Sequence, residues 1–151
     1  MSKKIIFTTG GTGGHILPAV ATMEHFSKLG YEVVLVTDLR GENFIKENFI
    51  YKSYIINAGT FTNKNIFKKI LSLLLIFFSI LRSVLIIIKE KPNLIFGFGG
   101  YVSFPISLIS KIFNIPLVVY ENNLVLGRAN RILIKFAKKV FLGNGSSINF
   151  P

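Results

Sequence analysis

The residues best suited to chemistry stand near the start of the chain, where four glycines and a histidine follow a short apolar run. Residues Lys4 to Thr9 are rich in β-forming side chains and stop at Gly10-Gly11-Thr12-Gly13-Gly14-His15. Glycines that follow a strand and open a helix leave backbone N–H groups pointing outward, and the helix dipole favours negative charge there. We therefore expect the segment from Gly10 to His15 to bind an anionic group.

Three kinds of anion site compete for this loop. A dinucleotide site requires a third glycine where Ile16 stands, although Asp38 ends the second predicted strand, where a ribose-binding acid would lie. A P-loop requires a lysine where His15 stands, which excludes it. A sugar-nucleotide or lipid-diphosphate transferase loop gives His15 a use, because imidazole titrates near neutral pH and can act as general base or diphosphate contact. A glycine turn needed only for packing is the alternative without a ligand.

Strands and helices are predicted to alternate along the chain. Apolar runs predict five further strands, at Glu32–Thr37, Tyr54–Asn57, Leu94–Phe96, Leu117–Tyr120 and Val140–Leu142. Helices are expected at Leu17–Leu29, Gly41–Phe49, Lys64–Lys89, Pro105–Phe113 and Gly127–Lys138. This alternation predicts an α/β fold, a doubly wound, Rossmann-like parallel sheet that forms a single domain over residues 1–151.

Composition and charge limit the classes of function. The chain has no cysteine, which excludes disulfide frameworks, thiolate metal sites and cysteine nucleophiles. A net charge of +11 favours anionic partners such as phospholipid headgroups or nucleotide diphosphates, with compositional drift as the alternative explanation. Nucleic acid is not favoured, because the basic residues are spread over helices without a recognisable binding module. The N-terminus shows no apolar signal-peptide segment.

Two further segments follow predicted strands. One is Gly97-Phe98-Gly99-Gly100-Tyr101-Val102-Ser103-Phe104-Pro105, and the other is Tyr120-Glu121-Asn122-Asn123 with Gly127 and Asn130 downstream. Together with the first loop, and in this order, they resemble the MurG family of membrane-associated transferases, which add GlcNAc to lipid I in peptidoglycan synthesis. The resemblance covers essentially all 151 residues. Tyr120 stands where the family has His, and Asn122 where it has Gln.

The resemblance implies the N-terminal, acceptor-side half of a GT-B enzyme, whose reaction takes place in the cleft between two Rossmann-like domains. Its residues for the donor UDP-GlcNAc are Thr12, Gly13, Gly14 and Asn123. Those it places at the reaction centre are His15, Tyr101 and Glu121. Either His15 or Glu121 could act as the base for the C4 hydroxyl of MurNAc, and His15 is preferred. Those it places at the acceptor diphosphate of lipid I are Gly11, Gly99, Gly100, Tyr101 and Ser103. No metal and no cofactor are implied, because backbone N–H groups can hold phosphate.

The apolar stretch from Ile70 to Ile88 approaches the length of a membrane span. Arg82 interrupts it, and an arginine in mid-bilayer is costly. The stretch has three possible roles. The first is a core helix of the domain, and the second is a membrane-spanning helix, which would break the βαβ alternation. The third is a core helix that also contacts an anionic membrane surface. The resemblance favours the last, with the protein peripheral on the cytoplasmic face of the bacterial inner membrane. Basic residues that would support this contact, or form a solvated face, are Lys68, Lys69, Arg128, Arg131, Lys135, Lys138 and Lys139.

Family members carry a second, donor-binding domain, which we do not find in these 151 residues. We expect that domain to act in cis or in trans, and the isolated chain to be inactive. Two alternatives remain. One is a membrane-bound acceptor subunit that pairs with a separate donor chain, as in the split GlcNAc transferases of the dolichol pathway. The other is an NAD-binding Rossmann domain.

Overall fold

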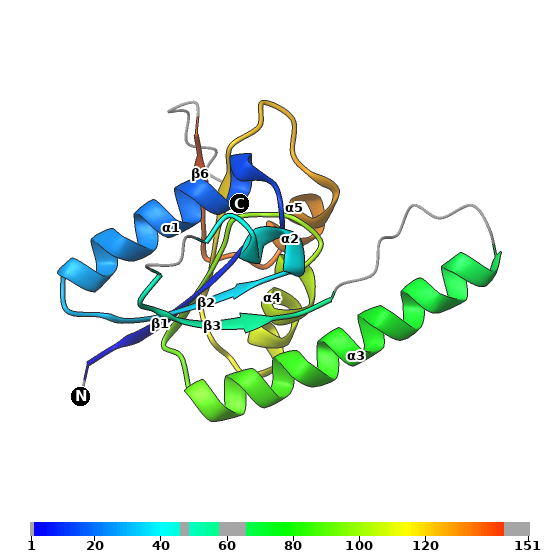
Figure 1. The fold of residues 1–151 in the computed structure, drawn as a ribbon, viewed down its shortest axis with the longest axis horizontal. Helices are drawn as coiled ribbons and strands as arrows, with labels where there is room; N and C mark the ends of the chain where they lie inside the picture. Colours follow the sequence, from blue (N-terminus) through cyan, green and yellow to red (C-terminus); the bar gives the residue numbers. More distant parts are fainter. Residues whose placement is uncertain (1, 46–48, 58–65, 144–151) are drawn as a thin grey trace.

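The computed structural model describes residues 2–45, 49–57 and 66–143, without the side chains of residues 66, 68 and 69. Strands and helices alternate through these residues (Figure 1). In chain order they are β1 (Lys4–Thr8), α1 (Gly13–Lys28), β2 (Glu32–Thr37), α2 (Leu39–Glu42), β3 (Lys52–Ile55), α3 (Ile66–Glu90), β4 (Leu94–Gly97), α4 (Ser103–Ile112), β5 (Leu117–Glu121), α5 (Arg128–Leu133) and β6 (Lys139–Leu142).

The six strands form one parallel sheet in the order β3-β2-β1-β4-β5-β6. Phe7 of the central strand β1 pairs with Leu35 of β2 on one side and with Phe96 of β4 on the other. The chain reverses direction across the sheet between β1 and β4, and ligands of such sheets bind at the carboxyl ends of the strands beside this reversal. The predicted doubly wound, Rossmann-like fold class is confirmed.

Helices cover both faces of the sheet. Ile6 and Phe7 are adjacent and both fully buried, because successive side chains of β1 point to opposite faces. Helix α1 packs on the Phe7 face, and α3, α4 and α5 pack on the Ile6 face. This burial on both faces explains why β1 reads as an unbroken apolar run in the sequence.

Several boundaries differ from the prediction. Helix α1 begins at Gly13 and not at Leu17, because the two glycines adopt the first turn after the extended residue Thr12. Helix α5 ends at Leu133 and not at Lys138, because the chain must turn into β6, and Lys138 N–H donates to Leu117 O at 2.7 Å. Helix α2 begins early because the Asp38 carboxylate caps it through Gly41 N–H, and residues 46–48 of the predicted helix lie outside the described residues.

Helix α3 is the crossover between β3 and β4. The stretch Ile70–Glu90 is long and apolar enough to cross a membrane by length and composition. Its C-terminal half, however, is part of the domain core, where Ser83, Ile86 and Ile87 are buried. The N-terminal half projects beyond the α/β body, on the side toward which β3 points (Figure 1). The predicted start at Lys64 lies outside the described residues.

Glu90 fixes the C-terminal end of α3 to the sheet. Its carboxylate is buried, and it accepts hydrogen bonds from the Tyr54 hydroxyl and from Lys4 Nζ at 3.0 Å. Lys52 Nζ forms an ion pair with it at 2.6 Å. Burial alone would raise the pKa of Glu90, but the contacts with Lys52, Tyr54 and Lys4 outweigh it and lower the pKa to about 2. The cluster therefore ties α3 to β1 and β3.

We predict that Glu90→Gln lowers the free energy of unfolding by about 3 kcal/mol at pH 7, because two ammonium groups lose their buried counter-charge. The folded-state pKa of about 2 lies below the ordinary 4.5. The stabilisation is therefore complete above pH 4.5 and is lost as the pH falls toward 2. Urea unfolding should show a smaller difference between wild type and variant at pH 3 than at pH 7.

The matched control is Glu24→Gln, which changes an exposed carboxylate on α1 and should cost less than about 0.5 kcal/mol. Equal losses for the two variants, or a Glu90→Gln loss that does not shrink at pH 3, would contradict the role given to this cluster.

Candidate functional site

The two glycine loops meet at the carboxyl ends of β1 and β4. Gly10 N–H donates to Gly99 O at 3.0 Å. Gly100 has a φ of +82°, and a Cβ added there would lie 2.7 Å from Gly10 Cα. A side chain at Gly100 would therefore force the two backbones apart. The contact between the two loops therefore requires glycine at position 100, and it leaves little space for a side chain at position 10.

The N-terminal end of α1 faces open space beside these loops. The N–H groups of Gly13 and Gly14 belong to the first helical turn, where the backbone offers no intrahelical acceptor. The Thr12 side chain does not cap the helix, and no acidic residue stands in the first turn. A Cβ added to Gly14 would meet nothing within 4 Å. Donors and a favourable dipole are thus available to an anion.

Glu121 organises the loop between β5 and α5. The residue is 1% exposed. Its Oε1 accepts from Asn123 N–H at 3.0 Å and Asn123 Nδ2 at 2.8 Å, and its Oε2 accepts from Gly127 N–H at 2.9 Å and Asn130 Nδ2 at 3.0 Å. Burial alone would raise the pKa of Glu121, but these four bonds outweigh it and hold the pKa below its usual value. Glu121 is a carboxylate with its acceptor positions filled.

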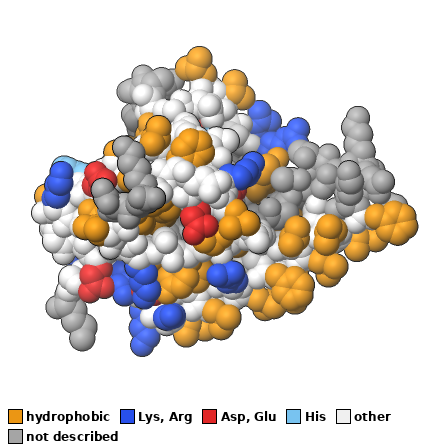
Figure 2. Space-filling view, viewed as in Figure 1, with side chains coloured by type: hydrophobic (Ala, Val, Ile, Leu, Met, Phe, Trp, Pro, Cys, Tyr) orange, Lys and Arg blue, Asp and Glu red, His pale blue; other side chains and the backbone are white. Residues whose placement is uncertain are grey.

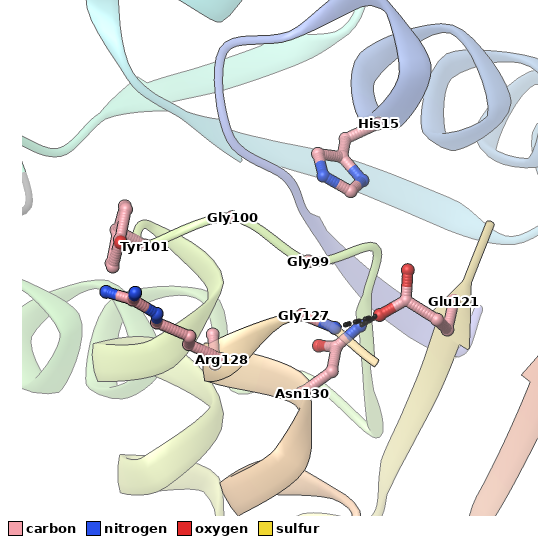
Figure 3. A pocket seen from close by; sticks show the side chains of 9 residues that line it. His15, Gly99, Gly100, Tyr101, Glu121, Gly127, Arg128 and Asn130 are labelled. Carbon is pink, nitrogen blue, oxygen red and sulfur yellow. Dashed lines mark hydrogen bonds between the residues drawn. The ribbon is translucent and has the colours of Figure 1, made fainter. Parts of the chain in front are cut away.

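A pocket of about 260 Å³ lies between the loops, the end of β5 and the start of α5 (Figure 3). Its lining residues are His15, Gly99, Gly100, Tyr101, Glu121, Gly127, Arg128, Ala129 and Asn130. Two buried polar atoms of this lining, His15 Nδ1 and Asn130 Oδ1, have no hydrogen-bond partner within the described part of the chain. Since unpaired buried polar atoms are costly, the pocket is suited to a polar ligand.

The structure brings together five of the predicted site residues, which are His15, Gly99, Gly100, Tyr101 and Glu121. Ser103 is fully buried behind the second loop, where its hydroxyl donates to Thr8 O at 2.9 Å and Gly99 O at 2.6 Å. Gly11 is buried against Asp38 and Arg40 and does not line the pocket. Ser103 and Gly11 therefore support the loops from behind.

The residues predicted to contact the donor lie outside the pocket lining. Thr12 precedes α1 and Gly13 and Gly14 begin it, with Thr12 and Gly14 exposed, and Asn123 lies on the β5–α5 loop. Both the backbone N–H and the Nδ2 of Asn123 are bonded to Glu121. None of these four residues lines the pocket.

Four lining residues were absent from the predicted site, namely Gly127, Arg128, Ala129 and Asn130. Gly127 and Asn130 stood in the third motif, so their spacing from Glu121 carried a signal. The sequence pattern places Arg128 on the basic face of the last predicted helix. The sequence pattern of that helix does not show that Arg128 lines a pocket while its basic neighbours do not.

Asp38, the candidate ribose-binding acid of a dinucleotide site, is engaged by residues that follow it closely in the chain. Its Oδ1 accepts from Gly41 N–H at 2.8 Å, and its Oδ2 pairs with Arg40 Nη2 at 2.8 Å. Both oxygens are therefore engaged in capping α2 and holding Arg40. The residue that supported a dinucleotide site has a structural explanation.

The doubly wound sheet, with two glycine loops and an open helix N-terminus around a pocket at its reversal point, defines a Rossmann-like domain suited to phosphate-bearing ligands. Residues 5–142 match the Glycosyltransferase family 28 N-terminal domain. The chain therefore belongs to glycosyltransferase family 28.

Two curated relatives and one solved structure show the same likeness. The UDP-N-acetylglucosamine–N-acetylmuramyl-(pentapeptide) pyrophosphoryl-undecaprenol N-acetylglucosamine transferase of Rickettsia prowazekii is 37% identical, over 99% of this chain and 37% of its own length. The protein of the same name from Pelagibacter ubique is 33% identical, over 100% of this chain and 42% of its own. The crystal structure of Acinetobacter baumannii MurG superposes with a TM-score of 0.83 at 27% identity, over 99% of this chain and 43% of that one. The chain thus spans about two fifths of the length of these relatives.

We predict opposite effects of the same substitution at two glycines. Gly100→Ala should lower the free energy of unfolding by about 3 kcal/mol, because alanine is strained at positive φ and its Cβ would collide with Gly10. Gly14→Ala should leave stability unchanged or raise it by up to about 1 kcal/mol, because it adds helix propensity in open space. Urea denaturation of both variants tests this, and similar losses for the two would argue against the loop contact.

Proposed function

We propose that this chain is the acceptor-side half of an enzyme that transfers GlcNAc from UDP-GlcNAc to lipid I, forming lipid II for peptidoglycan synthesis. The observation that carries the proposal is the pocket in which His15 meets the second glycine loop. Family membership over residues 5–142 and the names of the relatives in Rickettsia prowazekii and Pelagibacter ubique support it. In this proposal the first turn of α1 contacts the donor, with Thr12, Gly13, Gly14 and Asn123 at its edge.

His15 is the proposed general base. The oxygen of the acceptor C4 hydroxyl attacks the anomeric carbon of GlcNAc, the bond from that carbon to the UDP oxygen breaks, and the hydroxyl proton passes to the imidazole. Glu121 is less suited, because its four acceptor positions are filled and its pKa is lowered. We assign Glu121 the role of a positioning residue that holds Gly127 and Asn130 in place.

The positive ends of backbone dipoles supply the electrostatic part of the proposal. Charge develops on the departing UDP, and N–H groups at the start of α1 face the space where a donor diphosphate would lie. The second loop, with Gly99, Gly100 and Tyr101, holds the acceptor diphosphate. A second domain, in the same chain or in a separate one, supplies the other donor contacts.

Helix α3 is the proposed contact with an anionic membrane surface, which would place the protein peripherally on the cytoplasmic face of the inner membrane. Exposed apolar side chains on its projecting half are Phe67, Ile70, Leu71, Leu73, Leu74, Leu75, Phe77, Phe78 and Leu81. At 100° per residue these side chains cover an arc of about 200°, which is wider than the stripe of an ordinary surface helix. Figure 2 shows hydrophobic side chains along this projecting helix.

Charged residues lie near one edge of that arc, and small residues lie on the opposite face. Arg82 and Lys89 are exposed on α3 and would face anionic headgroups. The opposite face carries buried serines, and Ser79 donates to Asn57 O at 2.8 Å and thus fastens the helix to the chain after β3. Helix α3 therefore has one face for the domain and a broad apolar face for a second environment.

We predict that the chain binds vesicles containing anionic phospholipid more tightly than neutral vesicles, and that added salt weakens this binding. The double variant Leu74→Glu, Phe78→Glu should reduce binding more than tenfold, because two large apolar side chains lose their burial. Vesicle co-sedimentation at two salt concentrations measures the effect.

Leu29→Glu is the control, since Leu29 at the end of α1 is 59% exposed and Phe78 is 61% exposed, but the two lie on opposite sides of the sheet. A loss with Leu29→Glu as large as with the double variant, or no binding to either kind of vesicle, would contradict the membrane contact.

The transfer reaction can be tested with a chimera in which this chain replaces the corresponding N-terminal part of the Pelagibacter ubique relative. We expect the chimera to move labelled GlcNAc from UDP-GlcNAc onto a short-chain lipid I analogue, and the unfused chain to show no turnover. His15→Asn should lower kcat by about 10²–10⁴-fold, as expected for removal of a general base. The chain's other histidine, His25, is exposed on α1, and His25→Asn should leave kcat unchanged.

Full activity of the His15→Asn chimera would remove His15 from the chemistry. Turnover by the unfused chain would contradict the need for a second domain.

A further inference from the structure

The pocket lining contains one arginine and no lysine, and that arginine is Arg128. Within the described residues its guanidinium makes no ion pair or hydrogen bond. Two other arginines are occupied, because Arg40 pairs with Asp38 and Arg131 donates to Leu126 O at 3.1 Å. Arg128 therefore brings an uncompensated positive charge to the pocket.

The backbone of Arg128 is held firmly although its side chain is exposed. The preceding N–H, that of Gly127, is bonded to Glu121 Oε2, and the following residues Ala129 and Asn130 are buried. The side chain extends toward the side of the pocket where Tyr101 lies, away from Glu121 (Figure 3). The charge thus lies beside the second glycine loop and not beside the start of α1.

The inner end of the pocket favours a ligand group that donates a hydrogen bond. The Asn130 amide is oriented by its Nδ2, which donates to Glu121 Oε2 and to Tyr120 O, so its unpaired Oδ1 can only accept. Asn130 is 1% exposed. It lies with His15 at Gly99, where an added Cβ would be 3.3 Å from both Asn130 Nδ2 and His15 Cε1. A ligand hydroxyl would satisfy Asn130 Oδ1.

We infer that Arg128 binds the diphosphate of the lipid acceptor at the mouth of this pocket, with the acceptor sugar directed inward to Asn130 and His15. The inference rests on the proposed function. A guanidinium matches two phosphate oxygens in a bidentate arrangement. The N–H groups of Gly99 and Gly100, which make no hydrogen bond within the described residues, add donors on the same side. Arg128 is therefore a specificity residue of the pocket and not part of a basic membrane face.

A diphosphate group is present in both the acceptor and UDP, so the test uses three probes. Inorganic pyrophosphate, geranyl diphosphate and UDP are titrated into the chain by calorimetry. Arg128→Gln should weaken pyrophosphate and geranyl diphosphate at least tenfold and change UDP less than threefold. Arg128→Lys should restore only part of the loss, because an ammonium cannot form the bidentate contact.

Lys135→Gln is the matched control, since Lys135 is exposed beyond the end of α5 and outside the pocket lining. It should change each affinity less than twofold. Circular dichroism of each variant checks folding. Binding to anionic vesicles should be unaffected by Arg128→Gln, whereas a residue of the membrane face would lower it.

Equal effects of Arg128→Gln and Lys135→Gln would overturn the inference, because they would reduce it to general surface charge. So would a loss confined to UDP, or a wild-type chain that binds none of the probes. Failure of the chimera to transfer GlcNAc while the Arg128 effects hold would refute the proposed function and leave the diphosphate site standing.

Discussion

The contact between Gly10 and Gly100 is the constraint on which the rest of the site depends. Two parallel strands can lie side by side with their following loops apart, but here the loops touch backbone to backbone, with Gly10 N–H bonded to Gly99 O. This contact fixes the start of α1 relative to the second loop. It thereby carries His15 to Gly99 and closes one side of the pocket. The glycines act as much through the space they leave for each other as through the donors they offer a ligand.

The Glu121 carboxylate and the His15 imidazole differ in their hydrogen bonding in this pocket. Glu121 uses both oxygens to hold the β5–α5 loop, whereas His15 keeps a buried nitrogen without a partner. The two departures from the family motif are joined to each other, because the Tyr120 hydroxyl donates to Asn122 Oδ1 at 3.2 Å. The ring of Tyr120 also lies tilted against that of Phe98, with centroids 5.2 Å apart, on the sheet face covered by α1. These changes therefore alter the support of the loop and leave Glu121 in its place.

Sequence reasoning succeeded where a single physical pattern dominates. Doubly buried strands such as β1 read as apolar runs, and their alternation with helices was enough to predict the parallel sheet and to bring His15, Gly99 and Glu121 to one edge. It failed where tertiary contacts decide. The early start of α2 depends on capping by Asp38, and the early end of α5 depends on the approach to β6. Ser103 is drawn behind its loop by two carbonyl oxygens, and Arg128 is separated from its basic neighbours only by the fold.

Helix α3 is rigidly held at one end and unsupported by the sheet at the other. Its 25 residues correspond to a length of about 37 Å. The Glu90 cluster fixes the C-terminal end of α3 to the sheet. The projecting N-terminal end of α3 would therefore set the distance between the domain and a surface that this end contacts. In the proposed membrane-bound state, the height of the pocket above the membrane surface would depend on the length and tilt of α3. In that state a diphosphate carried at headgroup level would reach the second loop without leaving the bilayer.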